Sequence, residues 1–407
     1  ITVGIILIMI YLLIIFWLIV LVYIYDYRGA VKKRLLCYNI TTLILILLAG
    51  LRYRIGSDTL EYELSFNSIP SIDNLTWRYI FESSNYEVGF TIFMSLIKSV
   101  FGSFWCFLLI QSSIINFCVC RFFKESTKNI FIAVLIYFIV LYYFINCEAA
   151  RQGVALAILL NSWSFFVDKK WTKSVMLIII ASMFHSSALI FLILPILKLC
   201  RLWDKLRPNI WSCIIILSIV ITSYFVQQFV SQTFLQYFVE GDFGGRVNAY
   251  YGDAHELSGI SLLTQVVYVL FYVVTPFLCL KRMKNEYHNY ENIAPVLILC
   301  SIFCVASGIP MVYRLTYYFM PFYFVMFSEN LSICQPINGK YYTIEGKSCD
   351  KIVILSILLM FLLYKIQPYF YEDGSASDMR YYMRFYPYNS VIEKGIDINR
   401  EELYRGI

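Results

Sequence analysis

The feature that most constrains this chain is a long series of apolar runs separated by short polar segments. Hydrophobic residues make up 60% of its 407 residues and charged residues only 15%, so a soluble fold could not bury its apolar surface. About 12 runs approach the ~20 residues that cross a bilayer as a helix. We therefore predict an all-α polytopic membrane protein with about 12 transmembrane helices, at residues 2–25, 35–51, 103–120, 129–145, 151–167, 174–185, 186–197, 210–226, 260–280, 293–308, 311–327 and 352–366.

Three of the apolar segments are too short to cross singly. The pair 174–185 and 186–197 is compatible with one bent helix, a short hairpin or a re-entrant pair, and 88–100 with a half-inserted helix. The first run has neither a basic flank nor a small-residue cleavage site before it ends. We therefore expect it to be a membrane span and not a signal peptide.

Basic residues choose the orientation of the helices. Six loops carry three or four Lys or Arg each, at residues 26–34, 121–128, 168–173, 198–207, 281–292 and 329–351. They fall on one side, which we take as cytoplasmic, if 88–100 does not cross and 174–197 crosses twice. This arrangement predicts one transmembrane domain over 1–366, with outer loops at 51–87 and 227–259, and an aromatic outer tail at 367–407.

A polar cluster occupies the first outer segment, where LRYRIGSDTLEY follows an apolar run. Arg52 and Arg54 are two residues apart, which places both guanidinium groups on one side of an extended or turning backbone. Gly56 permits a sharp turn before Asp58. The functional interpretation is an anion clamp with a carboxylate beside it. The structural alternative is arginine snorkelling at a helix end, with Asp58 as an N-cap.

Further candidates lie at the same predicted face. Glu87 precedes a short apolar helix, as either its N-terminal cap or a partner of the arginines. Glu148 and Arg151 are spaced for a local ion pair, but Arg151 opens a helix of small residues that suggests a charge facing a packed interior. His185, in the middle of an apolar stretch, is either a satisfied core histidine or a general base.

The remaining candidates lie further along the chain. The outer loop 227–259 has the length of a lid or binding loop and contains Arg246 and Tyr250. Arg314 follows a glycine and a proline that break a helix, an arrangement that builds sites at depth in membranes. The 12 cysteines form no metal motif, and no nucleotide-binding or nucleic-acid signature is present. We therefore expect no cofactor, no metal and no nucleic-acid partner.

Several short motifs, taken in order, resemble those of the EpsG family, which includes polysaccharide polymerases of the Wzy type. One departure is Gly56-Ser57, where family members have a small residue and Thr before the aspartate. The matching positions are Arg54, Gly56, Asp58 and Tyr62 (R-x-G-x-D-x-x-x-Y), Glu87, Gly89 and Phe90 (E-x-G-F), Arg151 and Ala155 (R-x-x-x-A), Phe184, His185 and Ser187 (F-H-x-S), and Arg314.

The resemblance implies a membrane glycosyltransferase with a GT-C-like fold, whose outer loops form a cavity. It would move a growing glycan from undecaprenyl pyrophosphate onto the next lipid-linked repeat unit, at the outer face of the bacterial inner membrane. A chain-length regulator and a flippase are the protein partners it implies. Candidate roles are catalysis for His185, Asp58 and Glu87, pyrophosphate binding for Arg52, Arg54, Arg151 and Arg314, and substrate binding for Tyr62, Glu148, Arg246 and Tyr250.

Two rival functions make different demands. A lipid-linked oligosaccharide transporter without catalysis would also need cationic residues, but along a path from one side to the other. A membrane O-acyltransferase would share the single embedded histidine but not the demand for arginines. Because the charges gather at one predicted face, the polymerase is favoured.

Overall fold

A computed structural model describes residues 2–56, 58–206, 269–284, 290–305, 314–331, 334–337, 340–343, 348–370 and 388–392. The chain forms two compact units, and each is described by itself. The first contains residues 1–195, 332–344 and 362–407, and the second contains 196–331 and 345–361.

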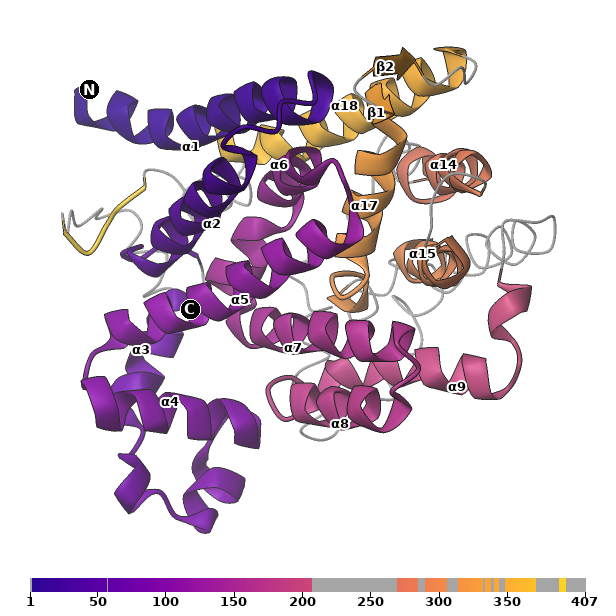
Figure 1. Cartoon of the computed structure of the whole chain (residues 1–407). Helices are drawn as coiled ribbons and strands as arrows, with labels where there is room; N and C mark the ends of the chain where they lie inside the picture. The colour runs from indigo at the N-terminus through magenta and orange to yellow at the C-terminus, as the bar shows by residue number, and fades with distance from the viewer. Residues whose placement is uncertain are drawn as a thin grey trace, which may run out of the picture. The chain divides into compact units, whose positions relative to one another are not determined.

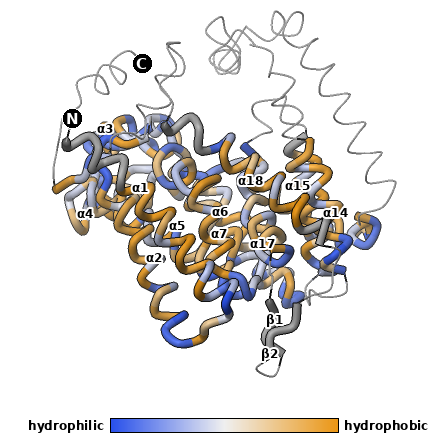
Figure 2. The backbone as a smooth tube through the Cα atoms, turned by 90° about the horizontal axis from the view of Figure 1, so that it is seen from above, coloured by the Kyte–Doolittle hydropathy of each residue, from blue (hydrophilic) through white to orange (hydrophobic). Residues whose placement is uncertain are grey.

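The first unit is built mainly from helices (Figure 1). Its helices are coloured as hydrophobic along most of their length, with hydrophilic residues gathered in the loops that join them (Figure 2). α5 is central, packing against α2 on one side and α7 on another, and α7 also packs on α8. The elements are α1 (Thr2–Leu21), η1 (Val22–Tyr27), α2 (Arg34–Gly50), α5 (Phe104–Ser126), α6 (Ile130–Val140), η4 (Phe144–Glu148), α7 (Ala150–Val167), α8 (Trp171–Ser182) and η5 (Ser186–Leu192), followed by α9 (Ile193–Leu199), which runs from this unit into the second.

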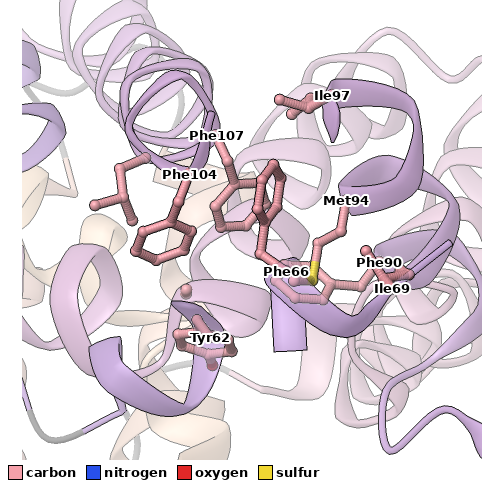
Figure 3. Close-up of a cluster of buried hydrophobic side chains, with 10 residues drawn as sticks. Tyr62, Phe66, Ile69, Phe90, Met94, Ile97, Phe104 and Phe107 are labelled. Carbon is pink, nitrogen blue, oxygen red and sulfur yellow. The ribbon is translucent and has the colours of Figure 1, made fainter. Parts of the chain in front are cut away.

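The predicted outer segment between α2 and α5 folds as four short elements, α3 (Thr59–Ser68), η2 (Ile72–Asn74), η3 (Tyr79–Ser83) and α4 (Val88–Phe101). α4 presents Phe90, Met94 and Ile97 on one face, the spacing of an amphipathic helix. These side chains meet Phe66 of α3 and Phe107 of α5 in an aromatic core (Figure 3). The core fixes the start of α4 against the membrane helices, because buried aromatic rings dominate packing energy.

The second unit contains η6 (Trp203–Lys205), η8 (Leu270–Val274), α14 (Thr275–Met283), α15 (Tyr290–Val305), α17 (Met320–Leu331) and the first part of α18 (Ser348–Phe370). A polar chain crosses its core, where Ser301 Oγ and Tyr323 Oη lie 2.8 Å apart and Tyr323 donates to the carbonyl of Tyr272. Phe271 stacks on Phe361. Burying these hydroxyls is tolerated because each has a partner.

One element departs from the predicted all-α fold. β1 (Cys334–Ile337) and β2 (Lys340–Thr343) pair as an antiparallel hairpin, in register Cys334 to Thr343, within the predicted loop 329–351. The loop has no apolar period long enough to signal a helix, and its KYYT stretch has the β-favouring residues of a strand.

The predicted fold class is supported in coarse form, but the predicted number of crossings is not confirmed. Of the described helices, Ile10–Tyr27 and Phe104–Ser126 are long and apolar enough to cross a bilayer, and seven further apolar helices are shorter. α4 has 14 residues and is about 21 Å long at 1.5 Å per residue, less than the ~30 Å hydrocarbon core. The apolar helices support a helical membrane protein, while the count of about 12 and the GT-C-like fold stay predictions.

Candidate active site

Three segments far apart in sequence bring Glu87, Arg151 and His185 together. Arg151 Nη1 donates to Glu87 Oε2 at 2.7 Å, and His185 Nδ1 lies 3.3 Å from Glu87 Oε1. The backbone amide of Ser186 donates to the same Oε1 at 3.2 Å. Glu87 is at the N-cap position of α4, but its carboxylate makes no capping hydrogen bond. The carboxylate therefore serves the cluster instead of the helix end.

The three side chains are enclosed but remain within reach of solvent. Their exposed fractions are 21% for Glu87, 29% for Arg151 and 22% for His185. Burial would raise the pKa of Glu87, but the His185 side chain and the charge of Arg151 outweigh it and lower the pKa to about 2. Glu87 is therefore ionised at every physiological pH.

The histidine ring is held on one side only. Nδ1 faces the Glu87 carboxylate but is poorly aligned for a hydrogen bond. Among the described residues, Nε2 has no hydrogen-bond partner. A carboxylate beside one ring nitrogen favours a proton there and leaves the other nitrogen to accept one.

Two tyrosines form the wall beside Arg151. Its guanidinium carbon lies 4.9 Å from the centroid of the Tyr86 ring, a cation–π contact, and its charge acts on the buried Tyr62 hydroxyl. Tyr62 Oη donates to the carbonyl of Glu148 at 3.3 Å, and Tyr86 Oη lies 3.0 Å from Ser65 Oγ. Burial raises the pKa of both tyrosines, so both stay protonated. The two tyrosines therefore add aromatic rings beside Arg151 but no negative charge.

Glycines explain why these segments meet. A Cβ added at Gly89 would lie 2.9 Å from the carbonyl oxygen of Met183, just before His185, and the Gly89 amide donates to that same oxygen at 2.8 Å. A Cβ at Gly153 would lie 2.3 Å from the carbonyl oxygen of Ile145. Each glycine of these motifs sits where one polar segment presses its backbone against the next, an approach that any side chain would block.

The Arg52–Asp58 segment joins the same assembly through a third glycine. Gly56 has φ +90°, and a Cβ there would lie 2.5 Å from the carbonyl oxygen of Cys147. Asp58 lies at the N-cap position of α3 without a side-chain capping bond, and its charge raises the pKa of Tyr62. The segment is thus pinned one residue before Glu148 and close to Tyr62.

Its two arginines have different environments. Arg54 lies 3.5 Å from Glu63 and has a left-handed backbone at φ 52°, a strained conformation of the kind that gathers at functional sites. Arg52 is only 1% exposed, and its Nη1 donates to the carbonyl of Ala49 at 2.6 Å. Of the two, Arg54 is therefore the one a ligand can reach.

The other candidates are distributed differently. Arg314 is exposed and belongs to the second unit, which is described by itself. Arg246 and Tyr250 lie outside the described residues. Nowhere in the described part of the chain do three His, Cys, Asp or Glu residues gather as metal ligands would.

Sequence reasoning missed a buried polar network behind the site. Asn116 donates to Asn146 Oδ1 at 2.9 Å and accepts from Tyr137 Oη at 2.9 Å, and all three are fully buried. Asn146 lies in η4, the π-helical turn before Arg151. The signal was present, because an asparagine between two apolar runs is costly unless it has partners. The network anchors the helix break that presents Glu148 and Arg151.

Together, the apolar helices and this cluster define a helical membrane protein in which an arginine, a carboxylate and a histidine meet in a partly enclosed site. A model of the EpsG family matches residues 35–390. The chain therefore belongs to the EpsG family, a family of proteins similar to Wzy-type polysaccharide polymerases. No match is found among curated proteins or among solved structures.

Proposed function

We propose that the protein is a glycosyltransferase that polymerises a surface polysaccharide. It would join oligosaccharide repeat units carried on undecaprenyl pyrophosphate, at the outer face of the bacterial inner membrane. The observation that supports this most is the pairing of a cation with a carboxylate-oriented imidazole, Arg151–Glu87–His185, in a membrane protein of the EpsG family. Binding alone would need the cation but not the imidazole beside the carboxylate.

The proposed chemistry is a displacement at the anomeric carbon of the growing glycan. A hydroxyl oxygen of the acceptor sugar forms the new C–O bond, and the bond to the pyrophosphate oxygen breaks. Undecaprenyl pyrophosphate leaves with the electron pair, and the hydroxyl proton passes to His185 Nε2. Glu87 holds Nδ1 and stabilises the imidazolium that forms.

The leaving pyrophosphate is the task of the arginines. A guanidinium keeps its charge in an enclosed site and binds phosphate oxygens through two parallel donors. We assign this role to Arg151 and Arg54, while the same role for Arg314 stays a prediction from the sequence. Arg52, enclosed at the end of α2, would instead support the segment that carries Arg54. Glu148 is the proposed contact to the acceptor sugar, the buried Tyr62 supports it through the bond to its carbonyl, and Asp58 is the alternative base.

The rival function is a flippase for the same lipid-linked oligosaccharide. Purified protein in detergent, incubated with an undecaprenyl-pyrophosphate-linked repeat unit, separates the two. The polymerase predicts a ladder of longer products on a gel, with one free undecaprenyl pyrophosphate released for each linkage formed. A flippase would leave the substrate intact in detergent and would move it between leaflets of a vesicle, and that result would overturn the proposal.

A further inference from the structure

A short C-terminal segment returns to the arginine segment across more than 300 residues of chain. The Tyr53 amide donates to the carbonyl of Asn389 at 2.7 Å, and the Val391 amide donates to the carbonyl of Leu51 at 2.9 Å. Between them, Arg52 pairs with Ser390 as an antiparallel β-bridge. We call residues 388–391 the strap.

The side chain at the start of the strap is also fixed. Tyr388 Oη donates to the carbonyl of Leu48 at 2.9 Å, and its ring meets Tyr11 edge to face at 6.1 Å. Tyr388 is almost fully buried. This docking uses a side chain and two backbone bonds, so it is more specific than a tail lying on a surface.

The strap completes the end of α2. The last carbonyls of a helix have no partner within it. Here Tyr142 Oη donates to Leu45 at 2.5 Å, Tyr388 Oη to Leu48, and Arg52 Nη1 to Ala49 at 2.6 Å. Of these donors, Tyr388 and Arg52 reach carbonyls of the last turn of α2, and the Arg52 charge complements the helix dipole.

The same residues lie next to the site. Arg52 and Tyr388 both lie close enough to the buried Cys147 to interact with it electrostatically. The carbonyl of Cys147 is the atom against which Gly56 packs. A displacement of the strap would therefore loosen the Arg52 turn, and with it the contact between Gly56 and the Cys147–Glu148 peptide.

We propose that the strap is a positioning element of the site, with Tyr388 as its key positioning residue. It holds the Arg54–Asp58 turn against Cys147 and stays docked during turnover. Its effect on catalysis rests on the proposed function, whereas its effect on Cys147 does not.

The test uses the full chain in detergent and two readouts. The first is the alkylation rate of Cys147, followed by mass spectrometry of its peptide, and the second is the rate of linkage formation from the lipid-linked repeat unit. Tyr388→Ala should raise the first and lower the second, each about tenfold, because it removes both the hydrogen bond to Leu48 and the packing of the buried ring. Tyr388→Phe loses only the hydroxyl and is measured in case the alanine variant does not fold. It should also raise the alkylation rate and lower the rate of linkage formation, each by about threefold.

A disulfide tether then tests whether holding the strap in place is enough to rescue the Tyr388→Ala variant. Leu51→Cys and Val391→Cys, added to Tyr388→Ala, face each other across the backbone pairing, at a separation that a disulfide spans. Oxidation should restore Cys147 protection and the rate, and reduction should abolish the rescue. Tyr27→Ala, at an exposed tyrosine of η1, is the control and should change neither readout.

Two results would overturn the proposal that the strap positions the site. One is unchanged Cys147 alkylation in both Tyr388 variants. The other is a lower rate when the tether is oxidised, which would mean that the segment has to leave during turnover. If the unaltered protein forms no linkages at all, the proposed function fails, and the alkylation result alone decides whether the strap holds the turn.

Discussion

Two enclosed carboxylate–arginine pairs in the first unit invite comparison. In the first, Asp26 has no exposed side-chain surface, and its oxygens accept from Arg34 Nη2 at 2.9 Å and from the Ile132 amide at 2.8 Å. In the second, Glu87 binds Arg151 at 2.7 Å and keeps about a fifth of its side-chain surface exposed. One pair closes a junction between η1, α2 and α6, and the other stands open beside a histidine.

The two pairs differ in access, because the oxygens of both carboxylates have donors but only the Glu87 side chain keeps exposed surface. Each Asp26 oxygen has a donor within the protein, and a ligand could reach neither without unfolding the junction. Glu87 instead orients two groups, Arg151 and His185, that each retain exposed surface. Removing one partner of a buried pair such as Asp26–Arg34 is costly, which is typical of a structural role. A partly exposed pair such as Glu87–Arg151 has surface left to contact a ligand.

The largest effect should follow from removing the proposed base. His185→Ala should lower the rate of linkage formation by roughly 10²- to 10⁴-fold, the range of a positioned general base. Binding of the lipid-linked donor should change little, because the alanine leaves Arg151 and Glu87 in place. If His185→Gln polymerises at the wild-type rate, the base is a carboxylate, with Asp58 the next candidate.

Arg151→Lys should cost slightly less, about 10²- to 10³-fold in rate, as when one electrostatic donor to a transition state is removed. The lysine keeps the charge but loses the planar fork and the contact with the Tyr86 ring. Arg78→Lys is the matched control, because Arg78 also pairs with a carboxylate, Glu82, but on the exposed surface. A wild-type rate in Arg151→Lys, measured on the same gel, would refute the pyrophosphate clamp.

A smaller loss should come from the packing that brings the segments together. In Gly89→Ala the new Cβ would meet the backbone of Met183, and such overpacking costs about 1–3 kcal/mol. We expect the rate to fall about tenfold through displacement of His185 from Glu87. Gly102→Asn is the control, since nothing lies within 4 Å of that position and asparagine tolerates its left-handed backbone. Equal rates in the two variants would show that the close approach is not needed.

The smallest effect concerns pH and stability. The pKa of Glu87 lies at about 2 in the folded protein, below its ordinary 4.5, so its ionised form stabilises the fold above pH 4.5. That contribution is lost as the pH falls from 4.5 toward 2. The difference in unfolding midpoint between wild type and Glu87→Gln should therefore be constant from about pH 8 to 5.5 and shrink below 4.5. A difference that changes around neutral pH would show that Glu87 is not the stabilised carboxylate described here.

Sequence reasoning succeeded where residue type alone carries the consequence. The apolar runs predicted helices because no other element hides its backbone in lipid, and Arg151 and His185 were recognised because charge and imidazole are costly in apolar surroundings. The family resemblance, which rested on these residues, is confirmed by the family match. The roles of the individual site residues stay predictions.

The sequence could not predict which carboxylate pairs with Arg151. Glu148 is three residues from Arg151 and was the obvious local partner, yet Arg151 binds Glu87, 64 residues away. The choice follows from Gly89 and Gly153, whose close contacts set the distance between segments, and no periodicity encodes such contacts. The β1–β2 hairpin was missed for the same reason, since long-range backbone pairing leaves little local signal. The aromatic tail was expected to lie at the outer face, but the partners of Tyr388 in α2 could not be predicted.

The most direct test of the distinction between the two pairs is the rate of linkage formation per folded molecule in Glu87→Gln and Asp26→Asn. Folded protein is quantified by size-exclusion chromatography before the lipid-linked repeat unit is added. The account predicts a rate at least about tenfold below wild type for Glu87→Gln, because Arg151 and His185 lose their common anchor. It predicts a wild-type rate for Asp26→Asn, despite a lower unfolding temperature. Equal rates in the two variants, or a greater loss in Asp26→Asn, would contradict it.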